Sequence, residues 1–399
     1  MTAISSVSFR QDAVSQMDAL QDALTKTQQQ LSSGLAFQTA ADNPVGMTQV
    51  NQLNMQLSAT SQYKTNQNAV SSNLTLEESA LTSATNVLES ANTLAVQAND
   101  ASLTYAQRQD IATQLQQLLQ QLVGVANSTD SNGNYLFGGT ATQTQPFTQS
   151  GNTVTYNGAT QVNQVHISSN QSVSAGDSGA SVFMNTPAGN GAFTTAAGST
   201  NTGTGWIDAG TVTNGSQWSA NTGTYTISFT DASDYQVTDG AGNVVSSGTY
   251  TTPGTIAFDG IQTTITGAPA AGDTFTIAPA GTASVFNTLS NLISALQSPT
   301  LNSGQLTSAL ATAQAQLNGA MGSIDSVQAS VGARINAITA AQTAAGSASV
   351  AIQTNISNIQ NVDYSQATTQ LASEELALQA AQQSYVSISK LSLFNYLQS

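Results

Sequence analysis

Apolar residues recur at every seventh position through a long stretch of the last third of the chain. The series is Leu310, Leu317, Ile324, Val331, Ile338, Ala345, Ile352 and Ile359. A step of seven keeps these side chains on one face of an α-helix. At a rise of about 1.5 Å per residue, the pattern predicts a single helix about 75 Å long.

The first third of the chain carries similar patterns. One stripe consists of Leu74, Leu81, Leu88 and Ala95, with Ala84, Ala91 and Ala98 between them. Small side chains at alternate layers allow a neighbouring helix to approach closely. A further helix is expected to begin after Thr104, which forms a capping-box pattern with Gln107, and to present Ile111, Leu115, Leu118, Leu122 and Val125 on one face.

Two breaks separate these long helices from a helix at each end of the chain. In the stretch SSGLAFQTAADNPVG, residues 32–46, Gly34 is a helix stop, and Asn43 before Pro44 is the N-cap of the next helix. Asp363, followed by Gln366 three residues later, is the corresponding N-cap near the other end. The sequence therefore predicts a separate first helix and a separate last helix.

These two terminal helices carry thin apolar stripes, which are the candidate assembly interface. A stripe this narrow buries too little apolar surface to offset the entropy of ordering its own helix. We therefore expect the two stripes to pair with each other or with neighbouring subunits. The candidate residues are Val7, Val14, Met17, Leu24 and Leu31 in the first helix, and Leu371, Leu378, Ala381, Tyr385, Ile388, Leu391 and Phe394 in the last.

The middle of the chain, from about residue 134 to residue 283, changes to glycine, threonine, asparagine and short alternating runs. Residues 154–162 predict a hairpin with Asn157-Gly158 at its turn, and residues 256–265 predict another at Asp259-Gly260. Residues 225–230, YTISFT, are a further strand candidate. Residues 186–205 are expected to be a linker between two β-rich parts.

Together these patterns predict an elongated α+β protein, in which both termini form a long helical coiled-coil bundle and a β-rich domain is inserted between them. We expect six parts. These are the N-terminal assembly helix 1–40, the rod segment 41–133, a small β subdomain 134–188, an inserted variable β domain 189–283, the second rod segment 284–361 and the C-terminal assembly helix 362–399.

Charge and composition exclude several classes of function. Six lysines and arginines stand against 21 aspartates and glutamates, which gives a net charge of −15 and no cationic surface for nucleic acid. The absence of cysteine excludes disulfides and cysteine-bound metals. We also expect no cleaved secretory signal and no membrane insertion, because the start lacks a cationic-then-apolar pattern and no apolar run of about 20 residues occurs.

Candidate catalytic and metal-binding residues are few, and we expect no enzyme, no metal and no cofactor. The single histidine, His166, is predicted to point to solvent from a strand. The sequences DSNGN, residues 130–134, and DGAGN, residues 239–243, are predicted to be tight turns rather than calcium loops. Glu374 and Glu375 are adjacent in a helix, so they point in different directions and do not form an acid/base pair.

Four segments, taken together, resemble the flagellin superfamily, and within it the junction proteins between hook and filament. They are SSGLAFQTAADNPVGM, LEESALTSATNVLESANTLAVQAND, NSTDSNGNYLFGG and LALQAAQQSYVSISKLSLFNYL. The likeness covers roughly the first 185 and the last 120 residues. Residues 186–283 look like the variable insertion of this family, and GDTFTI near their end resembles a recurrent end of such insertions.

The resemblance implies a secreted structural protein of the extracellular bacterial flagellum, exported through the flagellar type III channel and needed for motility. It implies four partners, namely hook-associated protein 1, flagellin, lateral copies of the same chain in one ring, and an export chaperone that recognises the last helix. Members of this family often begin with more basic residues than this chain does, so we expect assembly to depend only weakly on salt.

Two alternatives stay open. One is a flagellin filament subunit. The other, from a different class, is a secreted adhesin or calcium-binding protein that uses the β insertion. A type III translocator would need an apolar membrane segment, which the sequence lacks.

Overall fold

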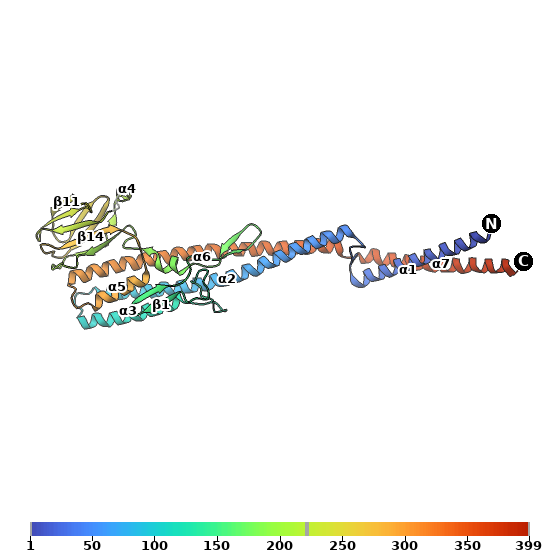
Figure 1. Ribbon diagram of the computed structural model, residues 1–399, viewed down its shortest axis with the longest axis horizontal. Helices are drawn as coiled ribbons and strands as arrows, with labels where there is room; N and C mark the ends of the chain where they lie inside the picture. Colours follow the sequence, from blue (N-terminus) through green and yellow to red (C-terminus); the bar gives the residue numbers. More distant parts are fainter. Residues whose placement is uncertain (1, 220–222, 398–399) are drawn as a thin grey trace. The chain divides into compact units, whose positions relative to one another are not determined.

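The computed structural model describes residues 2–219 and 223–397, and side chains within residues 8–219 and 223–387 together with Ser389. The chain forms two compact units. The first contains the residues up to Lys64 and from Gln342 onward, and the second contains residues Thr65 to Ala341. Helices α2 (Pro44–Ala98) and α6 (Ser303–Gln360) contribute to both units (Figure 1).

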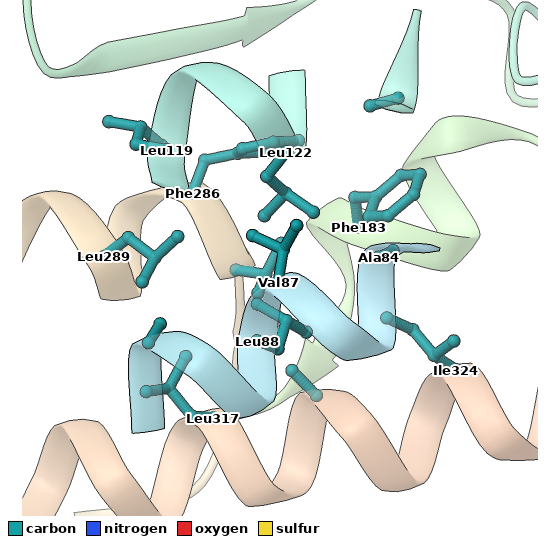
Figure 2. Packing of buried hydrophobic residues seen from close by; sticks show 14 of the residues in the cluster. Ala84, Val87, Leu88, Leu119, Leu122, Phe183, Phe286, Leu289, Leu317 and Ile324 are labelled. Atoms are coloured by element: carbon teal, nitrogen blue, oxygen red, sulfur yellow. The ribbon is translucent and has the colours of Figure 1, made fainter. Parts of the chain in front are cut away.

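The second unit has a core of four helices. Helices α2 and α6 lie with α3 (Tyr105–Ala126) and α5 (Val285–Gln297) around one hydrophobic cluster (Figure 2). The seven-residue stripes form this core as predicted, because Leu74, Leu81 and Leu88 of α2 are fully buried. On α6 the buried members are Leu310, Leu317, Ile324, Val331 and Ile338. The long uninterrupted helix predicted from these positions is confirmed.

Helix α3 begins as its sequence predicts. The hydroxyl of Thr104 accepts the backbone N–H of Gln107, and the side chain of Gln107 accepts the backbone N–H of Thr104. The predicted apolar face of α3 is confirmed, because Ile111, Leu115 and Leu122 are buried in the core. Leu118 and Val125 are half-buried and pack against the same core. Leu119, which was not predicted, is fully buried there. Leu119 completes the i, i+4 spacing with Leu115, which faces α2 and α5.

A small β region follows α3. Strands β1 (Phe147–Ser150) and β2 (Thr153–Tyr156) pair antiparallel, as do β3 (Gln164–His166) and β4 (Ser172–Ser174). The second hairpin is fastened to α2, because Gln67 Nε2 donates to the carbonyl of Ile167 at 2.6 Å. A one-turn π-helix, η1 (Ala180–Met184), adds Phe183 to a ring cluster that includes Phe147 and Phe286.

The hairpin predicted at Asn157-Gly158 is wrong. The turn lies earlier, where Gly151 has φ +61° and joins β1 to β2. Tertiary contacts end β2 at Tyr156, because its hydroxyl donates to the carbonyls of Phe137 at 3.1 Å and Ala159 at 2.7 Å. Those bonds hold residues 157–159 against the helix-to-strand junction instead of in a second strand.

The inserted β-rich domain contains two antiparallel sheets. The larger runs in the order β11-β10-β9-β14-β6, and the smaller in the order β12-β13-β7, with β8 also paired to β13. The strands are β6 (Phe193–Ala197), β7 (Trp206–Ile207), β8 (Thr211–Val212), β9 (Tyr225–Phe229), β10 (Asp234–Thr238), β11 (Val244–Thr249), β12 (Gly254–Phe258), β13 (Ile261–Thr266) and β14 (Thr274–Pro279). A short helix α4 (Gly215–Trp218) places Trp218 over the domain's own core. Two further strands, β5 (Thr186–Pro187) and β15 (Thr282–Ala283), pair where the chain enters and leaves this domain.

Two strand predictions for this domain are confirmed and one linker prediction is wrong. Asp259 and Gly260 both have positive φ, +42° and +80°, and they join β12 to β13 as expected of an Asp-Gly hairpin turn. Strand β9 occupies the YTISFT segment. The predicted linker at 186–205 instead contains β6, because Phe193 is buried in the domain core.

The predicted α+β fold class is confirmed, with the terminal helices packed together and an antiparallel β-rich region inserted between them. The division of the chain into six parts remains a prediction.

Candidate assembly interface

The first unit brings the two ends of the chain together. Helix α1 (Thr2–Ser33) packs along α7 (Tyr364–Leu397), as Figure 1 shows in blue and red. As predicted, α1 ends just before Gly34 and α7 begins just after Asp363. Gly34 ends α1 with φ +74°, a backbone region that glycine enters without a steric penalty.

The N-caps predicted at Asn43, before α2, and at Asp363, before α7, are confirmed. Asn43 Oδ1 accepts the backbone N–H of Gly46 at 2.9 Å at the start of α2. Asp363 Oδ1 accepts the N–H of Ser365 at 2.9 Å and that of Gln366 at 3.2 Å at the start of α7. Each cap satisfies N–H groups that have no partner within the helix.

The loop between α1 and α2 is ordered by a small set of contacts. Phe37 is buried, and Gln30 Nε2 donates to the carbonyl of Ala36 at 2.6 Å. Lys26 Nζ lies 3.0 Å from Asp42 Oδ1. Hydrogen bonds from Lys26 and then from Thr39 lower the pKa of Asp42 to about 2, so this carboxylate is ionised at neutral pH.

The predicted stripe residues are covered only in part when α1 and α7 pair. Val14 is 40% exposed. The half-buried members are Met17, Leu24, Leu31, Leu371, Leu378, Ala381 and Tyr385. The side chains of Val7, Ile388, Leu391 and Phe394 lie outside the described residues. The seven-residue stripes of α2 and α6 in the second unit, such as Leu81, Leu88 and Leu317, are fully buried, so an equally regular pattern leads to much less burial in the terminal helices.

Further apolar side chains of the first unit are exposed, and the stripe analysis missed them. Phe9 of α1 is 51% exposed and Leu376 of α7 is 68% exposed. The other members are Val45, Met55, Val350, Tyr364 and Val386. All but Tyr364, which is seven residues before Leu371, lie off the seven-residue positions, so counting every apolar residue on each helix, rather than one stripe, would have found them.

Neutral side chains dominate a groove in the same unit. Between α2 and α6 it is lined by the amides of Gln49, Gln52, Gln56, Asn355 and Asn358, together with Leu53 and Ile359. Amides and aliphatic side chains can pack and hydrogen-bond with a neighbour without an ion pair. This chemistry agrees with the few charges of the chain.

The residues considered for catalysis do not form a site. His166 is exposed at the end of β3, as predicted. Asp130 and Asp239 use their carboxylates to hold the predicted turns, accepting the N–H of Asn134 at 2.9 Å and of Asn243 at 2.8 Å. Glu374 accepts the side-chain amide of Gln370 on its own helix, and Glu375 is exposed. Within the described residues, no group of three or more histidine and acidic side chains is arranged to hold a metal.

One charged cluster was not anticipated from the sequence. Arg334 of α6 forms an ion pair with Asp177, whose backbone N–H donates to Glu77 Oε1 of α2 at 3.0 Å. Burial, and then the charge of Asp177, raise the pKa of Glu77 well above its ordinary value. Arg334 also donates to the carbonyl of Gly176 at 3.2 Å, so the cluster ties the loop after β4 to two helices.

This cluster borders a polar cavity of about 260 Å³, lined also by Asp130, Asn134 and Asn163.

None of the described helices is both long and apolar enough to span a membrane.

Two protein-family models match the chain. The model of the bacterial flagellin N-terminal helical region matches residues 4–142, which contain most of α1 and all of α2 and α3. The model of the D2-like domain of flagellar hook-associated protein 1 matches residues 196–279, most of the inserted β-rich domain. The insertion therefore has a recognisable relative of its own.

Individual relatives of the chain are also flagellar proteins. Flagellar hook-associated protein 3 of Salmonella typhimurium is 30% identical over 158 residues, which are 40% of this chain and 49% of that protein. In such alignments the chain spans about half the length, or less, of the curated relatives it matches.

Solved structures match over a longer part of the chain. Xanthomonas campestris FlgL is 35% identical with a TM-score of 0.71, over 76% of this chain and 99% of that one. The hook-associated protein 3 of Legionella pneumophila is 30% identical with a TM-score of 0.72, over 78% and 99%. The chain belongs to the family of flagellar hook-associated protein 3, structural proteins of the extracellular flagellum at the hook-filament junction rather than enzymes.

Proposed function

We propose that this chain is an adaptor of the hook-filament junction that joins neighbouring flagellar proteins through its terminal helices and is required for motility. The observation that carries the proposal is the incomplete cover of the apolar side chains on α1 and α7. Phe9 and Leu376 remain more than half exposed in the single chain. Packing against a neighbouring helix would remove that surface from water, at about 25 cal/mol per Å² of apolar area.

We propose the four partners that the resemblance to this family implies. Hook-associated protein 1 would lie on the side toward the cell and flagellin on the far side. Lateral copies of this chain would complete one ring, and an export chaperone would bind α7 before secretion. The neutral groove between α2 and α6 supports packing through amides and aliphatic side chains, so assembly should change little as ionic strength rises.

The decisive test places a charge on the α7 stripe. Leu378→Asp should abolish incorporation and motility, because an unpaired carboxylate would be buried at the interface. Gln379→Asp is the matched control, since Gln379 is exposed on the same helix and should tolerate the charge. A motile strain carrying Leu378→Asp would contradict the role of this stripe, provided that the variant protein is exported.

Deleting the gene tests the position of the protein in the flagellum. A junction adaptor predicts that flagellin is still secreted but is found free in the medium, unattached to hooks. If hooks without this chain still carry filaments, the adaptor role is wrong.

A flagellin subunit is the second candidate, favoured by the match of residues 4–142 to the flagellin N-terminal region. The two candidates differ in self-assembly. Purified flagellin should grow long filaments from seeds, whereas an adaptor should stop after one layer.

A further inference from the structure

The two edge strands of the large sheet in the inserted domain, β6 and β11, differ in whether another element covers their outer peptide groups. Strand β6 is covered by α6, because Thr312 Oγ1 donates to the carbonyl of Thr195 at 3.0 Å. Gln305 Nε2 donates to the carbonyls of Gly198 and Ser199, each at 3.0 Å, just after β6 ends. Peptide groups occupied in this way are not free to pair with another strand.

Strand β11, at the opposite edge, has no comparable cover within the part of the chain that the structure describes. Among the described residues its one strand partner is β10. Its sequence, VVSSGT, contains neither a charged residue nor proline, which are two of the usual protections of an exposed edge. Val244 is 55% exposed and Val245 is also exposed.

The geometry of β11 suits the addition of a strand. The register with β10 shifts once, near Val244, and is regular from Ser246 to Thr249. In a regular antiparallel pair the hydrogen bonds of alternate residues point away from the partner strand. The outer side of β11 therefore presents a short row of peptide groups, and Figure 1 labels the strand.

Charge decides which partner this edge fits. Residues 186–283 contain six aspartates and no lysine, arginine or glutamate. Asp234 is paired with Thr249 at one end of β11, and Asp239 lies in the turn that leads into its other end. Asp231 lies beside the first of these ends, where the N–H of Ser233 lowers the pKa of its carboxyl. Negative charge thus flanks an uncharged strand at both ends.

We propose that β11 is a docking edge for an extended, positively charged segment of another protein, which adds to the sheet as a further strand. Main-chain hydrogen bonds along Ser246 to Thr249 would supply the pairing, and basic residues at the two ends of the segment would meet the flanking aspartates. A second copy of this chain fits poorly, because it would bring together two domains that carry only negative charge. The proposal is independent of the terminal-helix interface.

Binding of a short synthetic peptide to the full-length chain tests this directly. The probe is an alternating valine-threonine peptide with lysine at each end, and the comparison peptide carries glutamate at those ends. We expect saturable binding of the lysine peptide, slower amide exchange in residues 244–249 on binding, and an affinity that falls as salt rises. The glutamate peptide should bind at least about tenfold more weakly.

Two lysine substitutions locate the site. Ser247→Lys puts a cation on β11 and should weaken binding at least about tenfold, whereas Thr255→Lys puts the same cation on an exposed position of β12 and should have less than about a threefold effect. Asp234→Asn should weaken binding without altering the strand. Equal losses from both lysine variants, equal binding of the two peptides, or no binding of the lysine peptide would overturn the proposal. So would a dimer of the wild-type chain that Ser247→Lys dissociates, because the occupant would then be a second copy.

Discussion

The backbone nitrogen of Val362 lies 2.9 Å from the carbonyl oxygen of Gly34, so the break after α1 and the break before α7 are hydrogen-bonded to each other. Ala36 adds a second bond, from its N–H to the carbonyl of Gln360 at 2.7 Å. The two terminal helices therefore leave the longer helices at one shared joint within the first unit.

The first prediction concerns this joint. Gly34→Ala should lower the free energy of unfolding by about 1 kcal/mol, because alanine is disfavoured at φ +74° and its Cβ would lie 3.1 Å from the hydroxyl of Tyr364. Amide exchange at Val362 should become faster. Gly322→Ala is the control, since Gly322 is helical with open space at its Cβ position, and that change should be neutral or stabilising. A melting temperature unchanged by Gly34→Ala would contradict the account of the joint.

The second prediction compares two leucines that occupy equivalent positions in a seven-residue stripe. Leu88→Ala should destabilise the isolated chain by about 2–5 kcal/mol, because Leu88 is fully buried among α2, α3 and α6 (Figure 2). Leu378→Ala should cost less than about 1 kcal/mol in the same chain, since Leu378 is only half-buried there. Urea denaturation of both variants measures the difference. Equal losses would mean that α1 and α7 form a complete core without a partner.

The third prediction concerns the acidity of Glu77. Its pKa is raised from 4.5 to about 8 in the folded chain, so between these values the folded state keeps a proton that the unfolded state releases. The stability contributed by this group is complete below about pH 4.5 and is lost as pH rises toward about 8, by up to about 1.4 kcal/mol per pH unit.

Glu77→Gln tests that linkage. The amide keeps an oxygen for the N–H of Asp177 and cannot ionise, so stability should become flatter between pH 5 and 8. Glu78→Gln, at the exposed neighbouring position, should leave the slope unchanged. If both variants follow the wild-type slope, Glu77 is already ionised in the folded chain.

The fourth prediction concerns the attachment of the inserted domain to α6. Gln305 is buried, and Gln305→Leu removes the donor for the carbonyls of Gly198 and Ser199. Because Gly198 is half-buried and Ser199 is exposed, water can reach their carbonyls, and losing these hydrogen bonds should cost about 0.5–1.5 kcal/mol. The loop 198–201 should become more sensitive to protease. Gln314→Leu on the same helix is the control, because the bonds from α6 to residues 198–201 among the described residues come from Gln305, and it should leave cleavage unchanged.

Local sequence signals determined the helical part of the chain. The capping bonds of Thr104, Asn43 and Asp363 join residues two or three apart, and the stripe from Leu310 to Ile338 repeats at a helical period. Such interactions are short in sequence, so their pattern can be read from the chain itself. The same holds for the Asp259-Gly260 turn, where the two residue types favour positive φ.

Only the tertiary structure decided where such local signals are overridden. Asn157-Gly158 has the composition of a hairpin turn, yet the hydroxyl of Tyr156 bonds to Phe137 and Ala159 and ends the strand there. The cluster of Glu77, Asp177 and Arg334 joins residues 100 and 157 positions apart, for which no sequence period exists.

For the candidate interface, too, the sequence determined one part and the tertiary structure another. The sequence predicted apolar stripes on the terminal helices, because periodicity shows which residues share a face. It could not show how much of each stripe the opposite helix covers, since burial depends on the side chains that face one another across the pair. The exposure of Phe9 and Leu376, and the contrast between the covered edge β6 and the open edge β11, are properties of packing, and the tertiary structure alone decided them.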